Sequence, residues 1–482
     1  MKTNKQKTIT FIIILIFVPF ILFAQDKVTA IDKLMQTYND YGRFNGTVLV
    51  AENGKVIFNK GYGLANMEWK IPNKPDTKFR LASITKQFTS MLIMQLVEEG
   101  KIKLDGKITD YIPEYRKDTG DKITIHHLLI HTSGIPSFTN RQDWREQNLK
   151  KHTVDEMVKE YCSGDLEFDP GTKFSYNNSG YFLLGTIIEK VTNKSYETVL
   201  KERIFDPVGM NNSGYDHFEN IIENRAAAYQ KAPGGYMHAA YLDMSNPYAA
   251  GALYSTADDL YLWDQALYSN KLLSKKYKKI MFTPYKDNYA YGWGVYKSQL
   301  GESTDSINVI THSGGINGFS TRIYRMIDDK HLIVLLNNIG TSLNGMVPAI
   351  QNILYNRPYD LPKKSIASTI VKTLVDKDIA NVIEYYRDLK ENHQDEYIFL
   401  EGELNNLGYQ LMGMNRIKDA IEIFKLNVEE YPDAFNPYDS LGEAYMIDGQ
   451  KELAIKNYAK SLERNPNHAG AIRMLSKIIE SD

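Results

Sequence analysis

Several residue patterns that commonly indicate disulfides, catalysis or metal binding are missing from this sequence. It contains a single cysteine, Cys162, so no disulfide can form within the chain even in an oxidising compartment. No Gly-x-Ser-x-Gly motif occurs, which argues against the nucleophile turn of the α/β-hydrolases. His127 and His131 stand four residues apart without the glutamate of a His-Glu-x-x-His zinc motif. Structural roles are therefore expected for both histidines, and no metal or other cofactor is predicted.

A strong excess of charge of either sign is also missing. The chain has 57 basic and 59 acidic residues and a formal net charge of -2, which gives it no general attraction to nucleic acid or to an anionic membrane. The one basic cluster, at 275–279, is interpreted as the solvated face of a helix. With 43% hydrophobic residues over 482 positions, the composition is that of a globular protein, and the length predicts two domains.

Long hydrophobic runs are missing except near the N-terminus. Lys2, Lys5 and Lys7 precede an apolar run at 9–23, the layout of a secretory signal peptide that is cleaved after Ala24. The run is shorter than the roughly 20 residues that span a bilayer as a helix, so a retained anchor is the weaker alternative and no stable membrane span is expected after cleavage. Cleavage removes three lysines and no acidic residue, which moves the formal net charge from -2 to -5. A periplasmic or secreted protein is expected.

Two strand-rich segments lie near the ends of the region 25–356. The first, at 46–63, has two β-rich runs separated by Asn53-Gly54, a pair typical of hairpin turns. The second, at 312–338, has two more runs around Asp328-Asp329, and helical stretches lie between the two segments. This order predicts an α+β domain in which the terminal strands share one antiparallel sheet flanked by helices.

The C-terminal part contains an internal repeat of 34 residues. The matching positions are Leu407 and Leu441, Gly408 and Gly442, Ala420 and Ala454, Phe424 and Tyr458, and Pro432 and Pro466. This period, with small residues where helices pack, resembles the tetratricopeptide repeat. Two prolines within 355–365 interrupt the patterns on both sides, so we expect a linker at 357–364 and an all-α repeat domain at 365–482.

Ser83 and Lys86 lie three residues apart at the expected start of a helix. The apolar stripe of this helix consists of Phe88, Met91, Leu92 and Leu96. At this spacing the amine lies close enough to take the hydroxyl proton, and the helix dipole and burial both disfavour an ammonium. Lys86 is therefore a candidate base for a Ser83 nucleophile. Taken alone, the segment favours a simpler alternative, in which Ser83 caps the helix and Lys86 is solvated.

A second candidate element is Tyr176-Asn177-Asn178, which lies between a Pro-Gly turn and an amphipathic helix. The tyrosine could carry a proton between a nucleophile and a leaving group, and the asparagine two residues on could hydrogen-bond a substrate amide. The other Tyr-x-Asn sequence, at 268–270, is interpreted as the end of a helix.

A third candidate element is His312-Ser313-Gly314-Gly315, which precedes a strand. Glycines here let a substrate lie against the strand edge and leave backbone N–H groups free for a carbonyl oxygen. The stretch does not fit a phosphate cradle, because no Gly-Lys-Ser/Thr follows it. A plain glycine turn is the alternative.

With these three elements in this order, the chain resembles the serine β-lactamase and penicillin-binding protein superfamily, specifically its class C-like branch. The resemblance covers roughly residues 30–356 and includes "ITIHHLLIHTSGIP", "GALYSTADDLYLW" and "YGWGV". It implies Ser83 as the acylated nucleophile, Lys86 as its activating base and Tyr176 as the proton shuttle.

The same resemblance implies the substrate-binding residues. Asn178 would contact the substrate, His312 and Gly314 would lie on the strand that lines the site, and the backbone N–H of Gly315 would complete the oxyanion hole with that of Ser83. One position departs from the usual pattern, since β-lactamases and transpeptidases usually carry lysine where this chain has His312. A histidine is largely neutral at pH 7 and would hold a substrate carboxylate less strongly.

The expected function is that of a serine hydrolase working through an acyl-enzyme on an ester, an amide or a D-amino-acid peptide. Its substrate would be a small molecule or a peptidoglycan-like peptide, and the C-terminal repeats could bind a protein partner. The alternative is a penicillin-binding acyl-sensor, or a cell-wall-associated binding protein with weak turnover.

Overall fold

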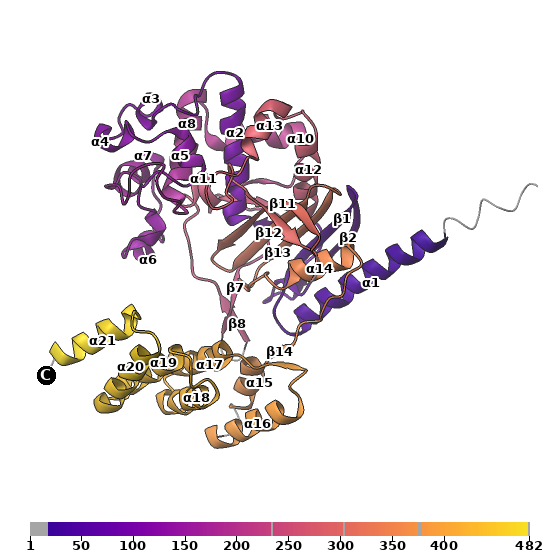
Figure 1. Cartoon of the computed structure of the whole chain (residues 1–482). Helices are drawn as coiled ribbons and strands as arrows, with labels where there is room; N and C mark the ends of the chain where they lie inside the picture. Colours follow the sequence, from indigo (N-terminus) through magenta and orange to yellow (C-terminus); the bar gives the residue numbers. More distant parts are fainter. Residues whose placement is uncertain (1–17, 233–234, 302–303, 375–377, 481–482) are drawn as a thin grey trace, which may run out of the picture. The chain divides into compact units, whose positions relative to one another are not determined.

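The computed structural model describes residues 18–232, 235–301, 304–374 and 378–480 (Figure 1). Two compact units are found, one within Met1–Gln230 and His238–Asp360 and the other within Lys231–Met237 and Leu361–Asp482. Most of the predicted signal peptide, residues 1–17, lies outside the described residues, and helix α1 (Val18–Asp40) continues through the predicted cleavage point after Ala24. Across the described ranges, no helix is long and apolar enough to cross a membrane.

A six-stranded antiparallel sheet forms the centre of the first unit. Its strands, in spatial order, are β10 (Gly294–Gln299), β11 (Ser306–Ile316), β12 (Phe319–Met326), β13 (His331–Asn337), β1 (Gly46–Glu52) and β2 (Lys55–Tyr62). The N-terminal hairpin joins the later strands through β1, whose Val48 lies opposite Leu335 of β13. The prediction that the terminal strands share one antiparallel sheet is confirmed.

Both faces of this sheet are buried, each by different helices. Leu49 and Leu336 point into a core built mainly from the helical region, whereas Val48 and Leu335 point into a second core with α1 and α14 (Met346–Leu354). Burial on both faces explains why β13 reads as a continuous apolar run and not as an alternating one. The sheet is therefore the middle layer of the unit.

The segment between β2 and β10 contains the helical region and several short strands. The helical elements are η1 (Ala82–Ile84), α2 (Thr85–Glu98), α3 (Ile108–Tyr111), α4 (Lys117–Gly120), α5 (Ile125–Leu129), η2 (Phe138–Asn140), α6 (Trp144–Gln147), α7 (Val154–Glu156), η3 (Met157–Tyr161), α8 (Asn178–Thr192), α9 (Tyr196–Leu200), η4 (Lys201–Phe205), α10 (Asp206–Val208), α11 (Tyr248–Gly251), α12 (Ala257–Tyr268) and α13 (Lys275–Met281). The short strands are β3 (Leu64–Asn66), β4 (Ile71–Pro72), β5 (Phe79–Arg80), β6 (Gly214–Tyr215), β7 (Tyr229–Ala232), β8 (Gly235–His238) and β9 (Leu253–Ser255).

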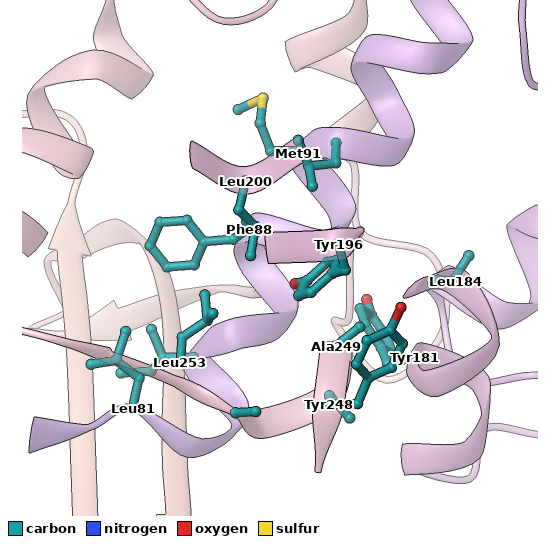
Figure 2. Packing of buried hydrophobic residues seen from close by; sticks show 14 of the residues in the cluster. Leu81, Phe88, Met91, Tyr181, Leu184, Tyr196, Leu200, Tyr248, Ala249 and Leu253 are labelled. Carbon is teal, nitrogen blue, oxygen red and sulfur yellow. The ribbon is translucent and has the colours of Figure 1, made fainter. Parts of the chain in front are cut away.

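Helix α2 is the central helix of this region. Its predicted apolar stripe is buried, and Figure 2 shows Phe88 and Met91 close to Leu200 of α9. The polar residues Gln87 and Thr89 are buried as well, so the helix is covered on almost every side. A helix enclosed in this way can hold a side chain out of contact with water.

The second unit is helical, as predicted, with one short pair of parallel strands and parts of β7 and β8. Its helices are α15 (Ile366–Thr373), α16 (Ile379–Asn392), α17 (Glu401–Gly413), α18 (Ile417–Glu430), α19 (Asn436–Ile447), α20 (Lys451–Arg464) and α21 (Ala469–Glu480), and its strands are β14 (Lys364–Ser365) and β15 (Tyr397–Ile398). Gly408 of α17 lies against the ring of Phe424 in α18, and Gly442 of α19 lies against Tyr458 in α20 in the same way. The two helix pairs repeat one packing arrangement. Their identity as tetratricopeptide repeats stays a prediction.

Gly408→Ala is expected to destabilise the second unit by about 1–3 kcal/mol, because the added methyl group overpacks the helix contact. A Cβ at this position would lie 2.3 Å from the Phe424 ring. Gly413→Ala in the same helix is the matched control, since a Cβ there meets nothing within 4 Å, and it is expected to stabilise the helix by up to about 1 kcal/mol. Urea unfolding of the full chain measures both changes, and equal midpoints for the two variants would contradict the packing described here.

Candidate active site

The turn that carries Ser83 has a strained backbone. Ala82, directly before the serine, has a φ of +51°, in the left-handed region that residues other than glycine rarely adopt. Two hydrogen bonds hold the preceding residue: the Leu81 N–H donates to the carbonyl of Leu253 at 2.7 Å, and its own carbonyl accepts from Thr321 Oγ1 at 2.8 Å. The turn is thus fixed between β9 and β12, and Ser83 is half-buried at the start of α2.

Lys86 lies one helical turn beyond Ser83 and contacts three oxygen atoms. Its Nζ is 3.2 Å from Ser83 Oγ, 2.9 Å from Asn178 Oδ1 and 2.9 Å from the carbonyl oxygen of Ala250. The side chain is fully buried. The prediction that Ser83 and Lys86 share one face at a helix start is confirmed by this geometry, and a solvated Lys86 is excluded.

The amine of Lys86 is buried without a compensating acid. Within the described part of the chain, none of its hydrogen-bond partners is a carboxylate, and its other neighbours include the rings of Tyr176 and Tyr181, with centroids 4.9 and 5.5 Å from Nζ. Burial lowers the pKa of Lys86 from 10.5 to about 7. As a neutral amine, Lys86 could donate to the carbonyl oxygens of Asn178 and Ala250 and direct its lone pair to the Ser83 hydroxyl.

Tyr176 lies beside Lys86, whose Nζ is 4.9 Å from the centroid of the tyrosine ring. The residue is 40% exposed at the surface, and its hydroxyl interacts with the side chain of Ser83. Burial raises the pKa of Tyr176 well above 10, and the hydrogen bond to Ser83 offsets only part of this rise. The hydroxyl is therefore protonated at neutral pH and can donate a proton, whereas Lys86 is better suited to accept one.

Asn178 connects Lys86 to the open part of the site. It is the first residue of α8, which Asn177 caps by accepting the Gly180 N–H at 2.8 Å. Its Oδ1 accepts from Lys86, and its Nδ2 donates to Thr139 Oγ1 at 3.1 Å. The same amide group thus contacts the buried base and the wall of the site.

His312 of β11 lies behind the site and has both ring nitrogens occupied. Its Nδ1 is 2.6 Å from the Ser313 carbonyl oxygen, which can only accept, so Nδ1 carries the proton and Nε2 accepts from Tyr289 Oη at 2.9 Å. Burial and the nearby charge of Lys86 lower the pKa of His312 to about 3. The side chain is 7% exposed. His312 is neutral, as expected, and its ring is hydrogen-bonded within the protein.

The two glycines of β11 have different surroundings. A Cβ on Gly314 would lie 2.1 Å from the carbonyl oxygen of Leu81, so a glycine is needed for β11 to approach the turn that carries Ser83. A Cβ on Gly315 would meet nothing within 4 Å. Of the β11 residues named from the sequence, Gly315 lines the open site, whereas His312 and Gly314 pack behind it.

A cleft of about 250 Å³ opens above Ser83. It is lined by Ala82, Ser83, Phe138, Thr139, Trp144, Asn148, Asn178, Leu242, Asn246, Pro247, Ala250, Gly251, Gly315, Ile316 and Asn317. Among these residues, all within the described ranges, there is no acidic, basic or histidine side chain. The walls combine apolar side chains with amide and hydroxyl groups, which suits an uncharged ligand.

Some residues at the site were not identified from the sequence. The Ala250 carbonyl gives no side-chain signal, although the quoted "GALYSTADDLYLW" begins at the next residue. His131 was assigned a structural role, but it lies directly beside Tyr176, with ring centroids 4.3 Å apart. Helix α5 ends before His131, so His127 and His131 do not share a helix face. In the described segments, no group of three or more His, Cys, Asp or Glu side chains is placed to hold a metal ion.

Comparison with known proteins gives consistent matches. The family model described as Beta-lactamase matches residues 31–354. The putative penicillin-binding protein PbpX of Bacillus subtilis (strain 168) is 32% identical over 314 residues, which cover 65% of this chain and 74% of PbpX. Among solved structures, a penicillin-binding protein from Bacillus halodurans is 28% identical with a TM-score of 0.57, and the match covers 66% of this chain and 98% of that one. A D-amino acid amidase from Ochrobactrum anthropi SV3 is 25% identical with a TM-score of 0.59, over 69% and 99% of the two chains.

The fold and these matches define the class of the protein as a β-lactamase-type serine hydrolase. The chain belongs to the beta-lactamase family, and the matched region coincides with the unit that contains the six-stranded sheet and the cleft.

Lys86→Met is expected to change how stability depends on pH. The pKa of Lys86 is depressed in the folded chain, so between about pH 7 and 10 the unfolded chain binds the additional proton. The free energy of unfolding of the wild type, relative to Lys86→Met, should therefore rise by up to about 1.4 kcal/mol per pH unit over this window and stay flat below it. Urea titrations at several pH values measure the difference.

Lys103→Met is the matched control, because Lys103 is exposed on the surface. This variant should leave the pH dependence of unfolding unchanged. A constant stability difference between the wild type and Lys86→Met from pH 6 to 10 would contradict a neutral buried amine.

Proposed function

We propose that this protein hydrolyses uncharged esters or amides through an acyl-enzyme on Ser83. The observation that carries the proposal is the fully buried amine of Lys86, which lies 3.2 Å from Ser83 Oγ with no acidic partner among the described residues. A lysine in this state has a pKa of about 7 and can act as a base near neutral pH.

Acylation would begin when Lys86 takes the proton of Ser83. The Ser83 Oγ then forms a bond to the substrate carbonyl carbon, and the backbone N–H groups of Ser83 and Gly315 are the proposed donors to the resulting oxyanion. The bond to the leaving group breaks as that group receives a proton from the Tyr176 hydroxyl, which the proton on Lys86 replaces through Ser83 Oγ or a water.

Deacylation would reverse these roles with water as the nucleophile. Lys86 takes one proton from water, directly or relayed through the Tyr176 hydroxyl, and the water oxygen bonds to the acyl carbon while the bond to Ser83 Oγ breaks. The proton returns to Ser83, and a carboxylic acid is released. Asn178, whose amide contacts both Lys86 and the cleft, is proposed to orient the acyl group.

The proposed preference for uncharged substrates rests on the cleft lining. A substrate carboxylate would enter a cleft whose described lining offers no cation, and a free α-ammonium would meet no acid there. Burying either charge without a partner is costly. One similar structure is named as a D-amino acid amidase, which supports amide chemistry, and we propose N-blocked or otherwise neutral acyl groups for this chain.

We also propose that the chain is exported and that its signal peptide is cleaved after Ala24. We further propose that the second unit is a tetratricopeptide-type array, which binds a protein partner. The 34-residue spacing and the matched contacts of Gly408 with Phe424 and of Gly442 with Tyr458 support the array. The names of the penicillin-binding relatives support a role outside the cytoplasm.

Ser83→Ala is expected to abolish turnover of a short-chain p-nitrophenyl ester and to remove any covalent adduct. Intact-mass measurement after mixing should detect a transient acyl group on the wild type and none on the variant. Full turnover by Ser83→Ala would contradict the proposed nucleophile. A stoichiometric adduct that persists on the wild type would instead identify an acyl-sensor.

A neutral ester is expected to have a kcat/KM at least about tenfold higher than an ester that differs only by a carboxylate on its acyl group, because the cleft offers that charge no partner. Asn148→Lys adds a cation to the lining and should narrow the ratio, while Asn148→Gln, the matched neutral control, should preserve it. Equal or better hydrolysis of the carboxylated ester by the wild type would contradict the proposed substrate class.

A further inference from the structure

His131 is a buried residue beside the site that the proposed mechanism does not use. It follows α5 with a φ of +60°, a backbone conformation that costs free energy for a residue other than glycine. The side chain is 1% exposed and does not line the cleft. A strained, buried histidine in this position calls for a physical reason.

His131 contacts the residue before Tyr176, the residue after it and the Tyr176 ring itself. The backbone carbonyl of His131 accepts the Ser175 N–H at 2.9 Å, and its ring Nδ1 accepts the Asn177 N–H at 3.0 Å. Its ring lies 4.3 Å from the Tyr176 ring between centroids, at an interplanar angle of 42°. One residue therefore holds the backbone on both sides of Tyr176 and also packs against its ring.

The hydrogen bond from the Asn177 N–H also fixes the tautomer of the His131 imidazole. Because Nδ1 accepts, the ring proton is on Nε2, which has no hydrogen-bond partner in the described part of the protein. The ring lies among Tyr176, Tyr181 and Tyr289, with centroid distances of 4.3, 5.1 and 4.7 Å. Burial, with the nearby charge of Lys86, holds the pKa of His131 well below its usual value. His131 is thus a neutral acceptor.

We propose that His131 is a positioning residue that places the Tyr176 hydroxyl at Ser83 by accepting the Asn177 N–H. This inference rests on the proposed role of Tyr176 in proton transfer. Small displacements of a reacting group are expensive, since about 1 Å can cost about 100-fold in rate. Loss of the Nδ1 acceptor would release the backbone next to Tyr176 and leave the Asn177 N–H buried without a partner.

Two substitutions of His131 test its hydrogen-bond acceptor and its aromatic ring separately. His131→Asn keeps an acceptor, because Oδ1 takes the place of Nδ1, and asparagine tolerates the left-handed backbone. His131→Phe keeps an aromatic ring against Tyr176 and loses the acceptor. Acylation of Ser83 by an uncharged alkyl ester, whose alkoxide leaving group needs the proton that Tyr176 is proposed to donate, is followed by rapid quench and intact mass on the full chain. It is expected to slow about 100-fold in His131→Phe and less than about tenfold in His131→Asn. Equal rates in the two variants would overturn the inference.

A double-mutant cycle tests whether His131 acts through Tyr176. In a Tyr176→Phe background the shuttling hydroxyl is absent, so adding His131→Phe should cost less than about threefold further, whereas a general structural defect would cost the same factor in both backgrounds. The same fold loss in both backgrounds would overturn the inference.

His331→Phe is the matched control. His331 is also buried, and its Nδ1 also accepts a backbone N–H, that of Asn53 at 3.0 Å, but it lies at the start of β13 and does not line the cleft. Acylation in this variant should match the wild type. If the wild type itself is not acylated on Ser83, the proposed function fails; if the wild type is acylated and His131→Phe reacts at the same rate, the inference about His131 alone fails.

Discussion

The burial of the Lys86 amine without an acid is the constraint on which the rest of the site depends. Water, or a nearby carboxylate, would restore an ordinary lysine pKa and keep the amine protonated. The fold avoids both by enclosing α2 and by surrounding Nζ with the oxygens of Ser83, Asn178 and Ala250. In the same unit the buried guanidinium of Arg325 is instead paired with Asp264 at 2.6 Å. Arg325, which has an acidic partner, is a structural charge, whereas Lys86, which contacts only neutral oxygens, can serve as a base.

Three residues with a strained backbone lie where the fold presents the reactive groups. Ala82 precedes Ser83, Tyr248 begins the short helix that supplies the Ala250 carbonyl, and His131 holds Tyr176; their φ values are +51°, +36° and +60°. Each conformation costs about 1–3 kcal/mol and persists only where the surroundings determine it. Hydrogen bonds to Leu81 and close packing of Gly314 supply that determination at the nucleophile. The large buried sheet and helices provide the stability against which this cost is set.

The sequence predicted the parts of this arrangement that have local patterns. Asn53-Gly54 marked the hairpin, the apolar stripe marked α2, and the spacing of Ser83 and Lys86 placed both at a helix start. Contacts that form between distant segments have no such pattern. The Ala250 carbonyl reaches Lys86 across 164 positions, and backbone atoms look alike in every sequence. The full enclosure of α2 was not predicted either, because Gln87 and Thr89 are polar and only tertiary packing buries them.

His312 stands where β-lactamases and transpeptidases usually carry lysine, and it does not line the cleft. Its ring is neutral because burial and the nearby charge of Lys86 lower its pKa, and it lies behind the cleft surface, hydrogen-bonded to Tyr289 and the Ser313 carbonyl. Under the proposed function, selection for or against charged substrates is made by the residues that line the cleft, whose described members have apolar, amide or hydroxyl side chains. A neutral group behind the wall leaves the electrostatics of Lys86 undisturbed, whereas a second cation there would add to the penalty on protonating it. With His312 neutral, burial accounts for the low pKa of Lys86 without help from a second cation.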